Sequence, residues 1–101
     1  MATAPARRRR RTIDTDSYLV AVARLVTNGG RRVADGNVED LAQLLELRNR
    51  LDEAILTAVA GLRDTGVTWQ EIGDTIGTTR QAAIMRWAAK VDEINGVDTW
   101  D

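Results

Sequence analysis

The stretch GVTWQEIGDTIGTTRQAAIMRW, residues 66–87, contains the features that decide the fold. Thr68 and Glu71 have the spacing of a capping box, in which the hydroxyl and the carboxylate bind free backbone amides at a helix start. Gly77 interrupts the helical pattern two turns later, and Thr79 is placed to cap a second helix. The stretch therefore predicts two helices joined by a tight turn, which is a helix-turn-helix unit.

Two glycines, Gly73 and Gly77, stand four residues apart in this unit. Glycine in a helix interior costs about 0.5–1 kcal/mol relative to alanine, so both positions call for a steric reason. We expect Gly77 to supply the left-handed backbone of the turn. We expect Gly73 to lie where the second helix crosses the first, so that a larger side chain would push the helices apart.

An apolar stripe beyond the turn predicts a final helix that ends at Gly96. We expect this stripe to pack against Ile72 and Ile76 of the preceding helix. Its members are Ala83, Trp87, Val91 and Ile94. We also expect Trp69 and Trp87 to pack in the core or at its rim.

The preceding residues predict two more helices. The first covers about 14–27, with Asp14 as its N-cap and the Asn-Gly-Gly sequence at 28–30 as its end. The second is leucine-rich and covers about 37–65, with Asn37 as its N-cap. The expected fold is therefore all-α, a small helical domain of about four helices with a C-terminal helix-turn-helix.

The composition narrows the function. The chain of 101 residues has no cysteine and no histidine, which removes the usual thiol nucleophile, general base and zinc ligands. We expect no catalytic activity, no metal site and no cofactor. The N-terminal sequence lacks the apolar segment of a secretory signal, so we expect a cytoplasmic protein.

The charge distribution is uneven. Residues 1–32 carry eight arginines against two aspartates, whereas the remaining residues sum to −7. We expect four segments: a disordered arginine-rich arm (1–12), a helical part with a long central helix (13–65), the helix-turn-helix (66–96) and a tail (97–101). The arm is open to interpretation as a solubilising tail, a phosphate-binding arm or, more weakly, a nuclear import signal.

The helix-turn-helix sequence resembles that of small regulators common in actinobacteria and their phages, and is similar to the DNA-binding helices of sigma factors and response regulators. In these families an apolar residue precedes the turn glycine, Ser or Thr caps the recognition helix, and Arg-Gln open it. The matching positions are Ile76, Gly77, Thr79, Arg80 and Gln81. Gly73 and Thr78 depart from the pattern, which more often has Ala and Val or Ile there. The resemblance covers about a quarter of the chain.

This resemblance implies a recognition helix in the major groove of double-stranded DNA, in a protein of the bacterial cytoplasm associated with the nucleoid. Helical spacing puts Gln81, Met85, Ala88 and Ala89 opposite the core stripe, with Ile84 at its margin. Gln81 would pair with adenine, Arg80 would contact guanine or phosphate, and Ile84 and Met85 would contact thymine methyl groups. The DNA-binding candidates are Thr79, Arg80, Gln81, Ile84, Met85, Arg86 and Lys90, together with Arg7, Arg8, Arg9, Arg10 and Arg11.

The sequence leaves alternatives open. Thr79 is interpretable as a cap only, and Arg86 and Lys90 as solvated surface charges. Ile84 and Met85 would also suit a protein partner such as RNA polymerase or a host regulator, which makes a protein-interaction module the alternative to a transcriptional regulator. The leucine-rich 41–62 segment fits a homodimer surface and an intramolecular core equally well.

Overall fold

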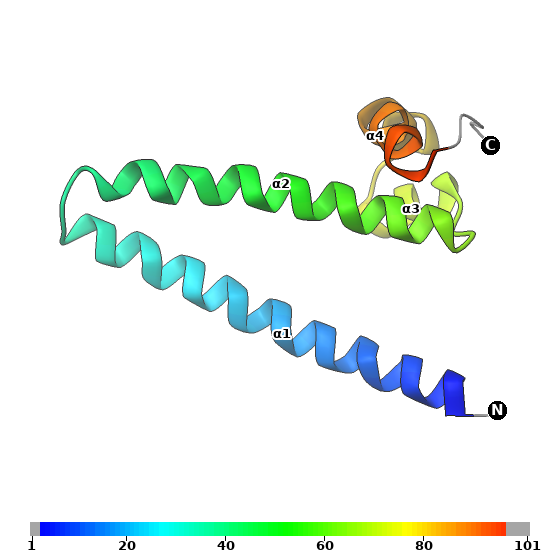
Figure 1. The fold of residues 1–101 in the computed structure, drawn as a ribbon, viewed down its shortest axis with the longest axis horizontal. Coiled ribbons are helices and arrows are strands. Elements are labelled where there is room, and N and C mark those ends of the chain that lie inside the picture. The colour runs from blue at the N-terminus through cyan, green and yellow to red at the C-terminus, as the bar shows by residue number, and fades with distance from the viewer. Residues whose placement is uncertain (1–2, 97–101) are drawn as a thin grey trace. The chain divides into compact units, whose positions relative to one another are not determined.

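The computed structural model describes residues 3–96, with side chains from residue 14 onward, and this part of the chain consists of helices and short connections (Figure 1). The predicted all-α fold class is confirmed. The four helices are α1 (Thr3–Ala34), α2 (Asp40–Asp64), α3 (Trp69–Ile76) and α4 (Arg80–Asn95). The predicted tail 97–101 lies outside the described residues.

The chain divides into an N-terminal unit, Met1–Glu46, and a C-terminal unit, Leu47–Asp101. The division falls inside α2, because the second half of this helix packs with α3 and α4. The C-terminal unit therefore contains the helix-turn-helix together with the part of α2 that supports it.

Helix α1 is longer than predicted at both ends. It begins at Thr3, so the backbone of residues 3–12 is helical where we expected a disordered arm, and Asp14 is an interior residue rather than the N-cap. Pro5 is compatible with this start because amides in the first turn have no partner within the helix. Arginine is also a good helix former, which favours extension through the arginine run.

The predicted end of α1 at 28–30 is also wrong. Gly29 and Gly30 do not have positive φ angles, and the helix continues through Arg31 and Arg32 to Ala34. A Cβ atom at Gly29 would lie 3.9 Å from Leu44 Cδ1, and one at Gly30 would meet nothing within 4 Å. These glycines are therefore ordinary helical residues, and the turn follows after Ala34.

Backbone hydrogen bonds define both ends of helix α2. The amide of Asp40 donates to the carbonyl of Asn37 (3.1 Å), so the helix begins three residues after the predicted cap through a tight turn. Its predicted end near residue 65 is confirmed, and Gly66 follows with a φ of +102°. The Gly66 amide donates to the Arg63 carbonyl and the Val67 amide to the Leu62 carbonyl, both at 3.0 Å, which is the hydrogen-bond pair of a Schellman motif.

The predicted capping residues of the helix-turn-helix are confirmed. The Thr68 amide donates to Glu71 Oε1 (2.8 Å), and the Glu71 amide donates to Thr68 Oγ1 (3.1 Å). Gly77 ends α3 with a φ of +79° in the left-handed region. Thr79 Oγ1 then accepts from the Ala82 amide (3.0 Å) and caps α4.

Gly73 is the point of closest approach in this unit. A Cβ atom there would lie 2.9 Å from the Thr79 carbonyl oxygen and 3.0 Å from that of Thr78, and both contacts are to backbone. The same turn uses the Gly73 carbonyl, which accepts from the amides of Gly77 and Thr78. The expectation that Gly73 permits a close crossing is therefore confirmed.

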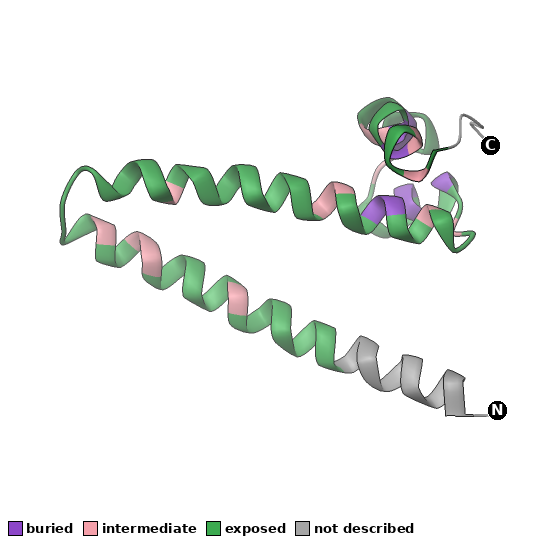
Figure 2. Cartoon of the chain, in the orientation of Figure 1, coloured by how far each residue is buried: buried purple, intermediate pink, exposed green. Residues whose placement is uncertain are grey.

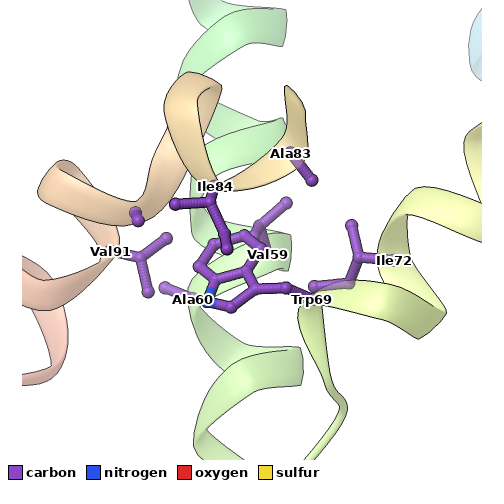
Figure 3. Close-up of a cluster of buried hydrophobic side chains, with 8 residues drawn as sticks. Val59, Ala60, Trp69, Ile72, Ala83, Ile84 and Val91 are labelled. Carbon is purple, nitrogen blue, oxygen red and sulfur yellow. The ribbon is translucent and has the colours of Figure 1, made fainter. Parts of the chain in front are cut away.

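The buried core lies in the C-terminal unit, where α2, α3 and α4 meet (Figure 2). Figure 3 shows the Trp69 indole in the middle of the cluster, with Ile84 directed toward it. Trp69 is 1% exposed, and the half-buried Trp87 packs against the cluster, so the packing roles expected for both are confirmed. The buried side chains are Val59, Ala60, Trp69, Ile72, Ala83, Ile84, Ala88 and Val91.

Two residues expected in the core are exposed. Ile76 is 52% exposed because it is the last residue of α3, beyond Gly73, where the turn toward α4 approaches α3. Ile94 is 54% exposed and lies in the last turn of α4, beyond Val91, the last buried residue of the helix. At the end of α4, Asn95 Nδ2 instead donates to the Ala60 carbonyl of α2 (3.0 Å).

Candidate nucleic-acid interface

The outer surface of α4 is the candidate interface. Successive residues of an α-helix are about 100° apart, so the positions opposite the buried side of α4 are Ala82, Met85 and Ala89. All three are exposed, and Met85 is 78% exposed. The small side chains of Ala82 and Ala89 protrude little from the middle of this face, which permits close approach of a flat or grooved partner.

Most of the candidate contact residues on α4 are exposed to solvent. They are Thr79, Arg80, Gln81, Met85, Arg86 and Lys90. Arg80 and Gln81 lie in the first turn of α4, which contains no acidic residue. The free amides and the positive end of the helix dipole at such a start favour negatively charged groups. Thr79 caps this turn, so its structural role is confirmed whatever else it contacts.

Ile84 and Ala88 do not belong to this surface. Ile84 is 9% exposed and Ala88 is 1% exposed, which contradicts their predicted positions at the margin and on the outer face. Both belong to the buried cluster that contains Trp69, and Figure 3 shows Ile84 directed toward the indole. The spacing of Ile84, Ala88 and Val91 also forms a helical stripe, so the sequence contained this signal beside the one we followed.

Arg86 and Lys90 line a groove between α2 and α4 in the C-terminal unit. The groove has a volume of about 350 Å³. The Arg86 guanidinium lies 4.9 Å from the centre of the Trp87 ring, within range of a cation–π contact. Asp52 and Glu53 line the same groove. The two cations are therefore close to two carboxylates, which reduces the positive potential available to a phosphate.

The α2 carboxylates are the part of this surface that sequence reasoning missed. Asp52 and Glu53 are about thirty residues before α4, and their helical spacing predicts only an exposed position on α2. Their proximity to Arg86 and Lys90 follows from the crossing of α2 and α4, which no local pattern encodes.

The overall charge of the helix-turn-helix is close to balance. Residues 68–95 hold three basic side chains against four acidic ones, a net of −1. Glu93 is exposed on the outer side of α4, and Asp74 on α3 accepts a hydrogen bond from Gln70 Nε2 (2.8 Å). The charge of this surface therefore supplies little attraction to a polyanion.

The arginines predicted to add such attraction, Arg7 to Arg11, have side chains outside the described residues; their backbone belongs to α1.

None of the helices in the described part of the chain has the length and apolar composition needed to span a membrane. No family model, no curated protein and no solved structure matches this chain.

Proposed function

We propose that the protein binds double-stranded DNA sequence-specifically through α3 and α4, as a small transcriptional regulator. The observation that carries this proposal is the capped turn, which holds α4 firmly at Gly73 while leaving its first turn and outer face exposed. Recognition helices contact base edges with the residues near their N-terminus. The proposed role is binding, without catalysis.

The proposed base contacts come from three residues. Gln81 offers an amide that can pair with the two hydrogen-bonding groups of adenine, and Arg80 offers a guanidinium for guanine or phosphate. The exposed thioether of Met85 would contact thymine methyl groups. Ala82 and Ala89 would allow the backbone of α4 to approach the floor of the groove. Ile84, being buried, has no part in this contact.

Affinity must come partly from elsewhere, because the helix-turn-helix has a net charge of −1. The five arginines at 7–11 would supply phosphate or minor-groove contacts. Replacing all five by glutamine should weaken binding to every sequence alike and flatten the dependence of affinity on salt. Sequence preference should remain, since base contacts come from α4.

Selection of binding sites from a random duplex library at two salt concentrations tests the proposal. A motif that stays enriched at the higher salt supports recognition of bases. Binding that shows no enrichment and disappears at higher salt contradicts it, because the interaction would then be purely electrostatic.

One observation favours a second candidate function. Met85 is a large apolar side chain that is 78% exposed on the same face of α4, and the unit is slightly acidic. Such a face suits a protein partner such as RNA polymerase or a host regulator. Failure of the selection, together with loss of partner binding on Met85→Asp, would favour this function over DNA binding.

A further inference from the structure

The N-terminal unit has no buried side chain among its described residues 14–46. The buried side chains of the described chain all lie between 59 and 91 (Figure 2). Large apolar side chains of α1 and early α2 nevertheless remain exposed in this unit. Exposed apolar side chains that gather in one patch are typical of an interaction site.

These apolar residues form one continuous stripe. On α1 they fall within an arc of about 120° centred on Val22, at about 100° per residue. Val22, Val33 and Leu44 are half-buried, and Gly29 lies close to Leu44, so the stripe includes the side of α1 that meets early α2. We call this set the hairpin stripe: Tyr18, Leu19, Val22, Leu25, Val26 and Val33 with Leu41, Leu44 and Leu45.

The exposures show that the hairpin leaves its own stripe largely uncovered. Leu19 is 58% exposed, Leu25 68% and Leu45 48%, although all belong to the apolar side of their helices. Two helices touch along a line and cannot enclose side chains of this size. Four helices can, as in bundles built from two hairpins.

The charges of α1 indicate what completes the bundle. Asp14 lies at one end of the described stripe and Arg32 near the other, and both are exposed. They are eighteen residues apart, which is about five helical turns, so they lie on the same flank of the stripe. In an antiparallel pair of identical helices each flank meets the same flank of the other copy. Asp14 of each copy would then lie beside Arg32 of the other, on both sides of the two-fold axis.

We propose that a second copy of this chain covers the hairpin stripe, with the two α1 helices antiparallel. This association does not require DNA, so it can be tested independently of the proposed function. It also shifts the expected dimer surface. The 55–60 part of α2 contributes Val59 and Ala60 to the core of its own unit, whereas the uncovered apolar surface lies on α1 and early α2.

The first test is the mass of the full chain in solution without DNA, by light scattering or sedimentation equilibrium. We expect twice the mass of the 11.1-kDa chain at micromolar concentrations. Leu19→Glu should raise the dimer dissociation constant about tenfold or more, because it puts a charge into the stripe. The matched control is the neighbouring Val20→Glu, since Val20 is similarly exposed (53%) but points away from the stripe. We expect the control to change the constant by less than about twofold.

A second test addresses the orientation. Asp14→Arg and Arg32→Asp should each weaken the dimer, and the double variant should restore it, because the ion pairs would re-form with reversed sign. Single-chain mass at all concentrations would overturn the proposal, whether the stripe is then covered within the chain or by another protein. Equal effects of Leu19→Glu and Val20→Glu, or a double variant weaker than both single ones, would overturn it too. Far-ultraviolet circular dichroism of each variant verifies that the helices are intact.

Discussion

The two units of this protein are both helical, but they are held in different ways. The C-terminal unit has a buried indole, two side-chain-capped helix starts and glycine-closed turns within about forty residues. The described N-terminal unit has two helices and no buried side chain. Short helices such as α3 are marginal alone, so tertiary packing must stabilise the C-terminal unit. The N-terminal unit depends on helix propensity and on what covers the hairpin stripe.

The largest effect should come from the centre of the core. Trp69→Ala removes the largest fully buried side chain and its contact with Arg63, whose guanidinium lies 5.0 Å from the ring centre. We expect a loss of about 3–5 kcal/mol in the free energy of unfolding, measured with denaturant. Trp87→Ala, at a half-buried tryptophan, should cost clearly less. Equal losses would mean that the core is not centred on Trp69.

The two isoleucines of α3 provide a matched comparison. Ile72→Ala should cost about 2–5 kcal/mol because Ile72 is 6% exposed, and Ile76→Ala should cost less than about 1 kcal/mol because Ile76 is 52% exposed. Thermal or denaturant unfolding of both variants gives the difference. A larger loss at Ile76 would show that α3 packs on the opposite side from that described.

Replacing glycine by alanine should change the free energy of unfolding in opposite directions at two helical sites. Gly73→Ala should destabilise the protein by about 1–3 kcal/mol, because the new Cβ would meet backbone carbonyls at 2.9 and 3.0 Å. Gly61→Ala is the control in α2, where nothing lies within 4 Å, and should stabilise by up to about 1 kcal/mol. Stabilisation by both substitutions in denaturant titrations would contradict the close approach at Gly73.

Removing the side-chain cap of α4 should have the smallest effect on the free energy of unfolding. Thr79→Ala removes the acceptor for the Ala82 amide and should cost about 1 kcal/mol, whereas Thr79→Ser keeps the hydroxyl and should cost a few tenths. Hydrogen exchange at the first amides of α4 reports the loss locally. Unchanged exchange in Thr79→Ala would show that the cap is dispensable.

The features that sequence predicted correctly are local ones. The Thr68–Glu71 capping box and the turn at Gly77 depend on neighbours within a few residues, so spacing and conformational preference were sufficient. Gly73 was also interpreted correctly, because it lies one helical turn before Gly77, where the backbone of the turn comes close to α3.

The features that sequence missed depend on contacts between elements. The side of α4 that faces the core was misjudged at Ile84 and Ala88, because the cluster around Trp69 buries these two residues as well as Ala83 and Val91 of the predicted stripe. The continuation of α1 through Gly29 and Gly30 was missed because their Asn-Gly-Gly setting also suits a helix end, and the backbone there stays helical. Ile84 is therefore no longer a candidate contact residue, and the description of the candidate interface now includes the carboxylates Asp52 and Glu53, which line the same groove as Arg86 and Lys90.

The most direct test of the central claim compares dissociation constants for a selected duplex and a scrambled one. Wild type, Arg80→Ala/Gln81→Ala and the exposed α2 control Gln43→Ala would be measured side by side at fixed salt. If α4 recognises bases, the double variant loses at least about tenfold of the preference for the selected duplex, and the control keeps it. An unchanged preference in the double variant would contradict base recognition by the first turn of α4.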